Sequence, residues 1–167
     1  YGITLALAMP ASGLFARIFI FFHDCTHGSF LPSPRWNRNV GYVLGILTFT
    51  AFHDWRRSHS GHHITAGDLD RRGTGDIWML TVEEYQNLSP RKRLWYRIYR
   101  SPWVLFFLGP PVLFVVIRRF PDTSFRAREI SSVYWTNLGV LAMVAGMSAL
   151  FGFWQYIVVQ LPVIWIA

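Results

Sequence analysis

All six histidines of this 167-residue chain lie between positions 23 and 63, and two groups of them have spacings that suit metal binding. His23 and His27 are four residues apart, and His59, His62 and His63 follow the pattern i, i+3, i+4. On an α-helix such residues share one face, so each group can direct its imidazoles at one point. Imidazole suits Fe, Zn, Cu or Ni, and a site without thiolates argues against Zn–thiolate and Fe–S chemistry. We therefore interpret both groups as ligands of one metal centre.

The remaining polar residues near these groups receive other interpretations. His53 stands alone, and we interpret it as a hydrogen-bonded core residue. Cys25, the only cysteine, is two positions from both His23 and His27, which places it on roughly the opposite helix face, as a packing residue. Asp24 and Asp54 neighbour histidines and are candidate acceptors for imidazole N–H groups, a role that fixes the orientation of metal-bound histidines.

The composition indicates a membrane protein. Hydrophobic residues make up 52% of the chain and aromatic residues 17%, with 8 Trp and 14 Phe, which is too apolar for an ordinary soluble domain and consistent with aromatic belts at the interface. The net charge of +7 does not indicate a nucleic-acid binder, because the basic residues alternate with membrane-length apolar runs. A single cysteine excludes a disulfide scaffold. The chain begins and ends inside apolar runs, so we expect it to be an internal fragment.

The apolar pattern predicts an all-α integral membrane protein with spanning helices, interfacial or re-entrant helices and a cytoplasmic histidine-rich cap. The first segment has bilayer-spanning length, and its helix should continue through the first histidine group. The next apolar run is too short to cross, so we expect it to be interfacial or re-entrant. As one domain, the chain divides into 1–22 (span), 23–39 (first histidine group and loop), 40–52 (interfacial), 53–101 (second histidine group and cytoplasmic region), 103–117 (re-entrant or in-plane), 133–150 (span) and 154–167 (truncated span).

The polar stretch from Asp54 to Ser101 is predicted to be cytoplasmic, because it carries nine of the chain's Lys and Arg residues. The sequence Thr81 to Glu84 has the Thr-x-x-Glu form of a capping box, which favours a helix start. From there to about Arg100 we expect one amphipathic helix. Its apolar face would draw on Tyr85, Leu88, Leu94, Trp95, Ile98 and Tyr99.

The third apolar segment is interrupted by Gly109-Pro110-Pro111, and four arginines follow it, Arg118, Arg119, Arg126 and Arg128. The positive-inside rule places these arginines in the cytoplasm, so we expect residues 103–117 not to cross the membrane. Residues 133–150 then cross outward, Gly152 forms a tight turn, and the last segment returns. The continuation of the chain would lie on the same side as both histidine groups.

The residues HDCTH (23–27) and WRRSHSGHH (55–63) resemble the first two histidine boxes, H-[DE]-C-x-H and H-x-x-H-H, of the membrane fatty acid desaturases. The similarity is greatest to the acyl-lipid type, of the omega-6/omega-3 or delta-12 group. Thr26 stands where Gly is more usual in the first box, and a helix tolerates Thr better than Gly. A third box, another H-x-x-H-H, belongs to the family pattern and is absent from this sequence.

The resemblance implies a membrane oxidoreductase that inserts a cis double bond into a fatty acyl lipid with two iron ions and O₂. It implies iron ligation by His23, His27, His59, His62 and His63. It also implies an electron donor, either cytochrome b5 or a ferredoxin-like protein, which the basic stretch from Arg91 to Arg100 could attract; anionic lipid headgroups are an equal alternative for that stretch. Without the third box, the fragment alone is expected to be inactive.

Three alternatives stay open at this point. A hydroxylase or carotenoid ketolase of the same superfamily would keep the histidine boxes and change the product. A non-catalytic membrane haem or metal-transport protein fits less well, because bis-histidine haem ligation usually takes one histidine from each of two spanning helices. A degenerate, inactive remnant of a desaturase is the third.

Overall fold

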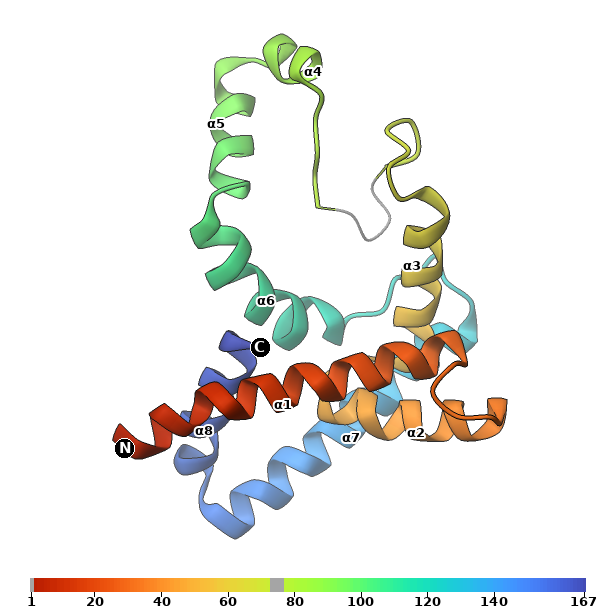
Figure 1. Cartoon of the computed structure of the whole chain (residues 1–167), viewed down its shortest axis with the longest axis vertical. Coiled ribbons are helices and arrows are strands. Elements are labelled where there is room, and N and C mark those ends of the chain that lie inside the picture. Colours follow the sequence, from red (N-terminus) through yellow and green to blue (C-terminus); the bar gives the residue numbers. More distant parts are fainter. Residues whose placement is uncertain (1, 73–76) are drawn as a thin grey trace. The chain divides into compact units, whose positions relative to one another are not determined.

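The computed structural model describes residues 2–72 and 77–167, and every regular element within these ranges is a helix (Figure 1). The predicted all-α class is therefore confirmed for this part of the chain. Two compact units are present, Tyr1–Arg56 with Pro111–Ala167, and Arg57–Pro110. We call them the first and the second unit.

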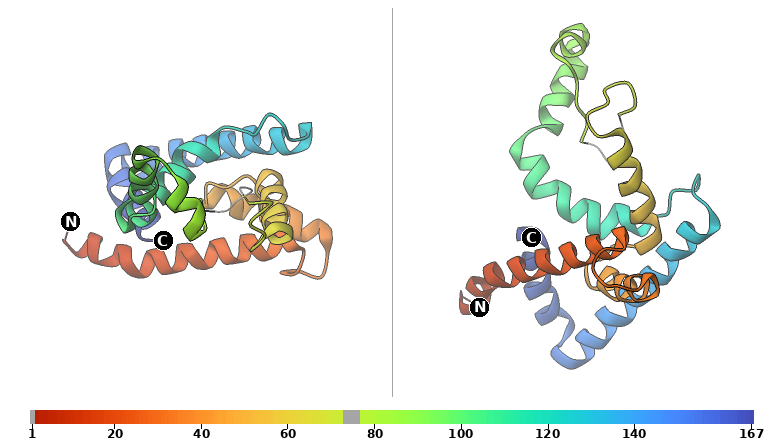
Figure 2. Two further views of the ribbon diagram at one scale, coloured as in Figure 1. Left: turned by 90° about the horizontal axis from the view of Figure 1, so that it is seen from above. Right: turned by 45° about the vertical axis from the view of Figure 1, so that its right-hand side comes forward.

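The first unit is built on α1 (Gly2–His27), α2 (Pro34–Leu47), α7 (Ala127–Phe151) and α8 (Phe153–Ile166). Helix α1 packs against α2 and α8, and α7 packs against the same two helices, as Figures 1 and 2 show. Helix α2 begins at Pro34, earlier than the apolar pattern suggested, because proline suits the first helical position, where its missing N–H costs no hydrogen bond. A β-carbon at Gly139 of α7 would collide with the side chain of Ile46 of α2, so glycine permits this close approach.

The core of the first unit lies where α1 meets the first turn of α3 (Phe52–Thr65). Phe22 packs edge-on against Phe52 and Trp55, with ring centroids 6.2 and 5.2 Å apart. Cys25 is 1% exposed in the same cluster, which confirms its interpretation as a packing residue. This core supports the back of α1 at the point where its histidines stand.

Among the described residues, two helices are long and apolar enough to cross a membrane, α1 with 26 residues and α7 with 25. Helix α1 includes the first histidine group, as predicted. Helix α8 is apolar but has only 14 residues. Gly152 between α7 and α8 has φ +87°, and a β-carbon there would collide with the side chain of Gln155, so the predicted tight turn requires glycine. Helix α5 (Pro90–Tyr99) and the stretch Trp103–Arg119 reach membrane-crossing apolarity only as a pair, bent by 52°.

The stretch that contains Gly109-Pro110-Pro111 is helical throughout, not interrupted. A π-helix (Trp103–Leu108), the short α6 (Gly109–Pro111), a second π-helix (Val112–Val116) and a 3₁₀ turn (Ile117–Arg119) follow one another. Proline has no N–H to donate and its ring crowds the preceding turn. Wider i→i+5 hydrogen bonding accommodates this, and the chain stays helical.

The second unit holds α4 (Val82–Asn87) and α5, joined by Leu88 and Ser89. The capping box is confirmed, since Thr81 Oγ1 accepts from Glu84 N and Glu84 Oε2 accepts from Thr81 N. The prediction of a single helix from Thr81 to about Arg100 is wrong. The backbone is extended at Leu88, and a new helix begins at Pro90 after the N-cap residue Ser89. Trp78, Tyr85, Tyr96 and Tyr99 form an aromatic cluster that fixes the two helices to the preceding strand-like segment.

Candidate metal centre

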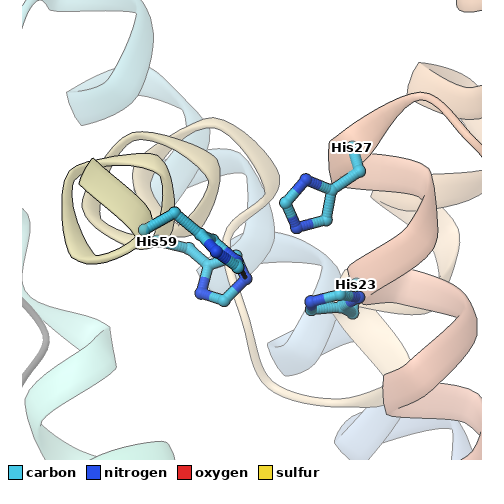
Figure 3. A group of neighbouring side chains, drawn as sticks. His23, His27 and His59 are labelled. Carbon is cyan, nitrogen blue, oxygen red and sulfur yellow. Dashed lines mark hydrogen bonds between the residues drawn. The ribbon is translucent and has the colours of Figure 1, made fainter. Parts of the chain in front are cut away.

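The first histidine pair stands on the last turn of α1. The rings of His23 and His27 have centroids 4.5 Å apart and lie on one side of the helix, as Figure 3 shows. His23 is half-buried and His27 is exposed. The i, i+4 spacing thus places the two imidazoles side by side on one helix face, as the sequence predicted.

Asp24 holds the ring of His23. Its Oδ1 lies 2.9 Å from His23 Nδ1. A carboxylate can only accept, so Nδ1 donates the proton, and in the neutral imidazole the lone pair is then on Nε2. Thr26 Oγ1 donates to His23 O at 2.7 Å, which caps the same turn. In this arrangement Nε2 of His23 is the atom that can bind a metal.

The second histidine group lies on α3, within the second unit. His59 Nε2 and His63 Nε2 are 2.9 Å apart, and their ring centroids are 4.4 Å apart. The His62 ring lies 6.0 Å from that of His59 and 5.9 Å from that of His63. All three imidazoles therefore gather on one side of α3, and Figure 3 shows His59 projecting from this helix.

The separation of these nitrogens can be compared with what a metal requires. With metal–nitrogen bonds of about 2.1 Å, two ligands at a right angle are about 3.0 Å apart. The 2.9 Å between His59 Nε2 and His63 Nε2 is the length of a hydrogen bond between the two rings, and it is close to that value. Imidazoles with this spacing and no thiolate beside them fit iron, and equally a zinc or copper ion, by donor chemistry.

The first turn of α3 is fixed in the first unit. Phe52, His53, Asp54 and Trp55 are all buried. The Trp55 ring packs edge-on against His23, with centroids 5.7 Å apart, so one aromatic side chain touches both the core and a candidate ligand. The histidines of the second group then follow along the same continuous helix.

His53 is the core residue that the sequence suggested. It is 6% exposed, its Nε2 accepts from Arg128 Nε at 3.1 Å, and its backbone N donates to Ser132 Oγ at 3.1 Å. Burial, followed by the positive charge of Arg128, lowers the pKa of His53 to about 4. A neutral imidazole that accepts from an arginine serves the structure of this turn, outside both histidine groups.

Asp54 pairs with a cation. Arg118 Nη1 donates to Asp54 Oδ2 at 3.3 Å. Burial raises the pKa of the Asp54 carboxyl, and the Arg118 guanidinium acts in the opposite direction. Asp24 therefore contacts a candidate ligand directly, whereas Asp54 ties the start of α3 to the segment before α7. The role of each carboxylate toward a bound metal stays a prediction.

Several residues that fix the start of α3 were missed in the sequence. The arginines after residue 117 served there only to predict the side of the membrane on which they lie. Arg119 donates through Nη1 to Asn137 Oδ1 at 2.9 Å and through Nη2 to the carbonyl of Phe49, and Asn137 Nδ2 donates back to Arg119 O at 2.8 Å. Phe49 has φ +57°, a left-handed conformation that is costly for a bulky residue. Arg119 thus braces the turn that leads into α3. The partners are 18 and 70 residues apart, so no local pattern could have revealed them.

Comparison with known proteins identifies the family. The family model described as "Fatty acid desaturase" matches residues 2–167. A fatty acid desaturase of Bacillus subtilis is 45% identical over 163 residues, which is 98% of this chain and 46% of that protein. An sn-1 acyl-lipid omega-3 desaturase (ferredoxin) of Synechocystis is 28% identical over 86% of this chain and 39% of its own length.

A third relative is the acyl-lipid omega-3 desaturase (cytochrome b5) of the endoplasmic reticulum of Arabidopsis thaliana. It is 42% identical over 82 residues, 48% of this chain and 20% of that protein. The chain spans less than half the length of each of these three relatives. No solved structure matches. With a family model that covers nearly every residue, and with two histidine groups on helix faces, this chain belongs to the fatty acid desaturase family.

Proposed function

We propose that the protein takes part in the O₂-dependent desaturation of a fatty acyl chain in lipid metabolism, through a di-iron centre ligated by His23, His27, His59, His62 and His63. The observation that carries this proposal is the grouping of the imidazoles on one side of each of two helices, in a chain that belongs to the fatty acid desaturase family. When bound, two irons with O₂ supply an oxidant strong enough for an unactivated C–H bond, which acid–base side chains cannot break.

The periodicity of α3 supports a single stripe of ligands in the second group. Trp55, which packs against His23, is followed four residues later by His59 and seven residues later by His62. On a helix these positions form one stripe.

The chain's own residues prepare the ligands. Asp24 holds the proton of His23 on Nδ1 and leaves Nε2 for the metal, and a carboxylate in this position also raises the basicity of the ring. The buried turn of α3 and its bonds to Arg118, Arg128 and Ser132 fix the start of the helix that bears the other imidazoles. Rigid support of this kind sets the metal–ligand geometry.

The substrate and the electron donor follow by analogy. Relatives are named as acyl-lipid desaturases, one with ferredoxin and one with cytochrome b5. We infer an acyl-lipid substrate and a small electron-transfer protein of one of these two kinds. Membrane lipids surround the apolar helices α1 and α7.

We also propose a multi-pass topology with both histidine groups on the cytoplasmic face. The basic residues of 53–101 and of 118–128 support this, because cytoplasmic segments are enriched in Lys and Arg. In this arrangement α7 crosses outward, α8 returns, and residues 103–117 do not cross. A cysteine introduced at Arg126 should react with an impermeant maleimide only after the cytoplasmic face is opened; reaction from outside in intact cells would overturn the topology.

The function is tested by replacing His62 with Ala in the full product of the gene. Loss of one ligand should abolish the conversion of saturated to unsaturated acyl chains, measured by gas chromatography of total lipids. Iron per chain, measured by mass spectrometry of the purified protein, should fall as well. Membrane insertion should stay intact.

His53→Gln is the matched control, because it removes a histidine that belongs to neither group and retains an acceptor for Arg128. This variant should keep its iron. If His62→Ala keeps both iron and activity, His62 is not a ligand. A Soret band in the wild-type absorption spectrum would instead identify a haem protein and reject the di-iron proposal.

A further inference from the structure

Helix α5, labelled in Figure 1, has one face whose side chains contact the rest of the second unit. Arg93 Nε donates to Leu88 O at 2.9 Å, and Arg97 Nε donates to Tyr85 Oη at 2.9 Å. Tyr96 Oη accepts from Leu80 N, and the Tyr96 ring packs on Trp78 with centroids 5.0 Å apart. This face therefore serves the structure of the unit itself.

The other face of α5 carries large apolar side chains that are open to the surroundings. Leu94 is 56% exposed, Trp95 58% and Ile98 42%. At about 100° per residue these three lie within about 100° of one another and roughly opposite Tyr96 and Arg93. Three large apolar residues together on an exposed helix face mark an interaction site, not ordinary surface.

The charge around this face is one-sided. Between positions 90 and 100 the chain has five basic residues and no acidic one, Arg91, Lys92, Arg93, Arg97 and Arg100. The π-helix that follows in the same unit exposes further large residues, with Trp103 and Phe106 each 70% exposed. A Lys/Arg-rich helix with Trp and aliphatic residues on one face is the pattern of a helix that lies in a membrane surface.

We propose that α5 lies in the plane of the membrane against anionic lipid headgroups, with Leu94, Trp95 and Ile98 inserted into the boundary with the acyl chains. Insertion to about 5–10 Å would cover these side chains, and the long side chains of Arg91 and Lys92 would extend to the lipid phosphates. A lipid surface fits better than an acidic redox protein, because electron-transfer contacts are small and transient and gain little from a row of buried aliphatic side chains. The inference does not depend on the metal chemistry.

Spin labels test the proposal in the full product of the gene, in a Cys25→Ala background, reconstituted in phosphatidylcholine vesicles that contain phosphatidylglycerol. Labels on Leu94→Cys and Ile98→Cys should collide often with O₂, which concentrates in lipid, and rarely with a water-soluble nickel chelate. Lys92→Cys, on the same helix but outside the apolar face, is the matched control. Its ratio of oxygen to nickel collisions should be severalfold lower. Circular dichroism should show unchanged helix content in all three.

The charge contribution is tested with Arg91→Gln/Lys92→Gln in the Ile98→Cys protein. Insertion should become shallower in the vesicles with phosphatidylglycerol and should hardly change in pure phosphatidylcholine. Labels at 94 and 98 that are open to the nickel chelate would overturn the proposal, and labels shielded from both reagents would show that protein covers this face. If the labels become shielded only when a ferredoxin is added, the face is a donor site and the lipid proposal fails.

Discussion

The two histidine groups stand on helices that are supported in different ways. Around His23 and His27, α1 keeps its opposite side in the core, where Phe22 and Cys25 are 0% and 1% exposed. Helix α3 is buried only in its first turn, and none of its residues after Trp55 is buried. The first pair is thus positioned by packing directly behind it. The second group is positioned by the continuity of one helix from an anchored start.

This difference has a chemical counterpart. His23 has a carboxylate partner, Asp24, at 2.9 Å, and this fixes which nitrogen carries the proton. His59 and His63 approach each other through Nε2 atoms, and one ring must donate to the other when no metal is present. A metal bound by both nitrogens would take the place of that shared proton. The second group should therefore respond more strongly to metal, and the first should be more nearly preformed.

The largest effect is expected when the continuity of α3 is broken. Ser60→Pro removes an N–H and places the ring against the preceding turn between His59 and His62, at a cost of roughly 3 kcal/mol or more. Iron per chain should fall to near zero, although the first unit stays folded. Mass spectrometry of the metal content and limited proteolysis measure the two consequences.

Ser60→Ala at the same exposed position is the control for that change, and it should bind iron like the wild type. If Ser60→Pro also keeps its iron, the second group does not depend on helix continuity, and the contrast between the two groups is lost.

A smaller effect is expected from the partner of the first pair. Asp24→Asn keeps the shape of the side chain and removes the charge that orients His23, so iron affinity should fall by about 10–100-fold. Competition with a chelator of known affinity measures the change. Asp68→Asn, which alters a carboxylate paired with Arg71, should leave the affinity unchanged. Equal affinity in Asp24→Asn and wild type would show that packing alone orients His23.

The smallest effect concerns His53, the histidine outside both groups. Its pKa is about 4 in the folded protein and near 6.5 in the unfolded chain, so the unfolded chain binds more protons between these values. The free energy of unfolding should therefore decrease as the pH falls from about 6.5 toward 4. In His53→Gln this contribution should be missing, while the ligand histidines act alike in both proteins. Thermal unfolding of both proteins in detergent across this pH range measures the difference in stability. If stability depends on pH in the same way in both proteins, His53 does not make this contribution.

Features that depend on one or two helical turns were readable in the sequence. The i, i+4 spacing of His23 and His27, the capping box of Thr81 and Glu84, and the glycine turn at Gly152 all appear as expected. Each depends on atoms a few residues apart, which the local backbone brings together whatever the rest of the chain does. The histidine boxes also indicated the family, and the comparison with known proteins then established it.

Local patterns failed where two of them competed. The run from Thr81 to Arg100 has helical periodicity, yet Ser89-Pro90 makes a better helix start than a helix interior, so two helices form. The Gly109-Pro110-Pro111 sequence suggested a break in the helix, yet the chain stays helical there because π-helical hydrogen bonding accommodates the prolines.

Only the tertiary structure determined what anchors α3. The bonds Arg118–Asp54, Arg119–Phe49 and Arg128–His53 join residues 64, 70 and 75 positions apart. The sequence shows that an arginine is charged, but it does not show which residue the arginine bonds. The long side chain can reach any acceptor that folding brings near. The sequence alone established that imidazoles line two helix faces and which family the chain belongs to. Tertiary packing determined which arginines hold the start of α3 and the turn before it, because those contacts exist only once distant segments have met.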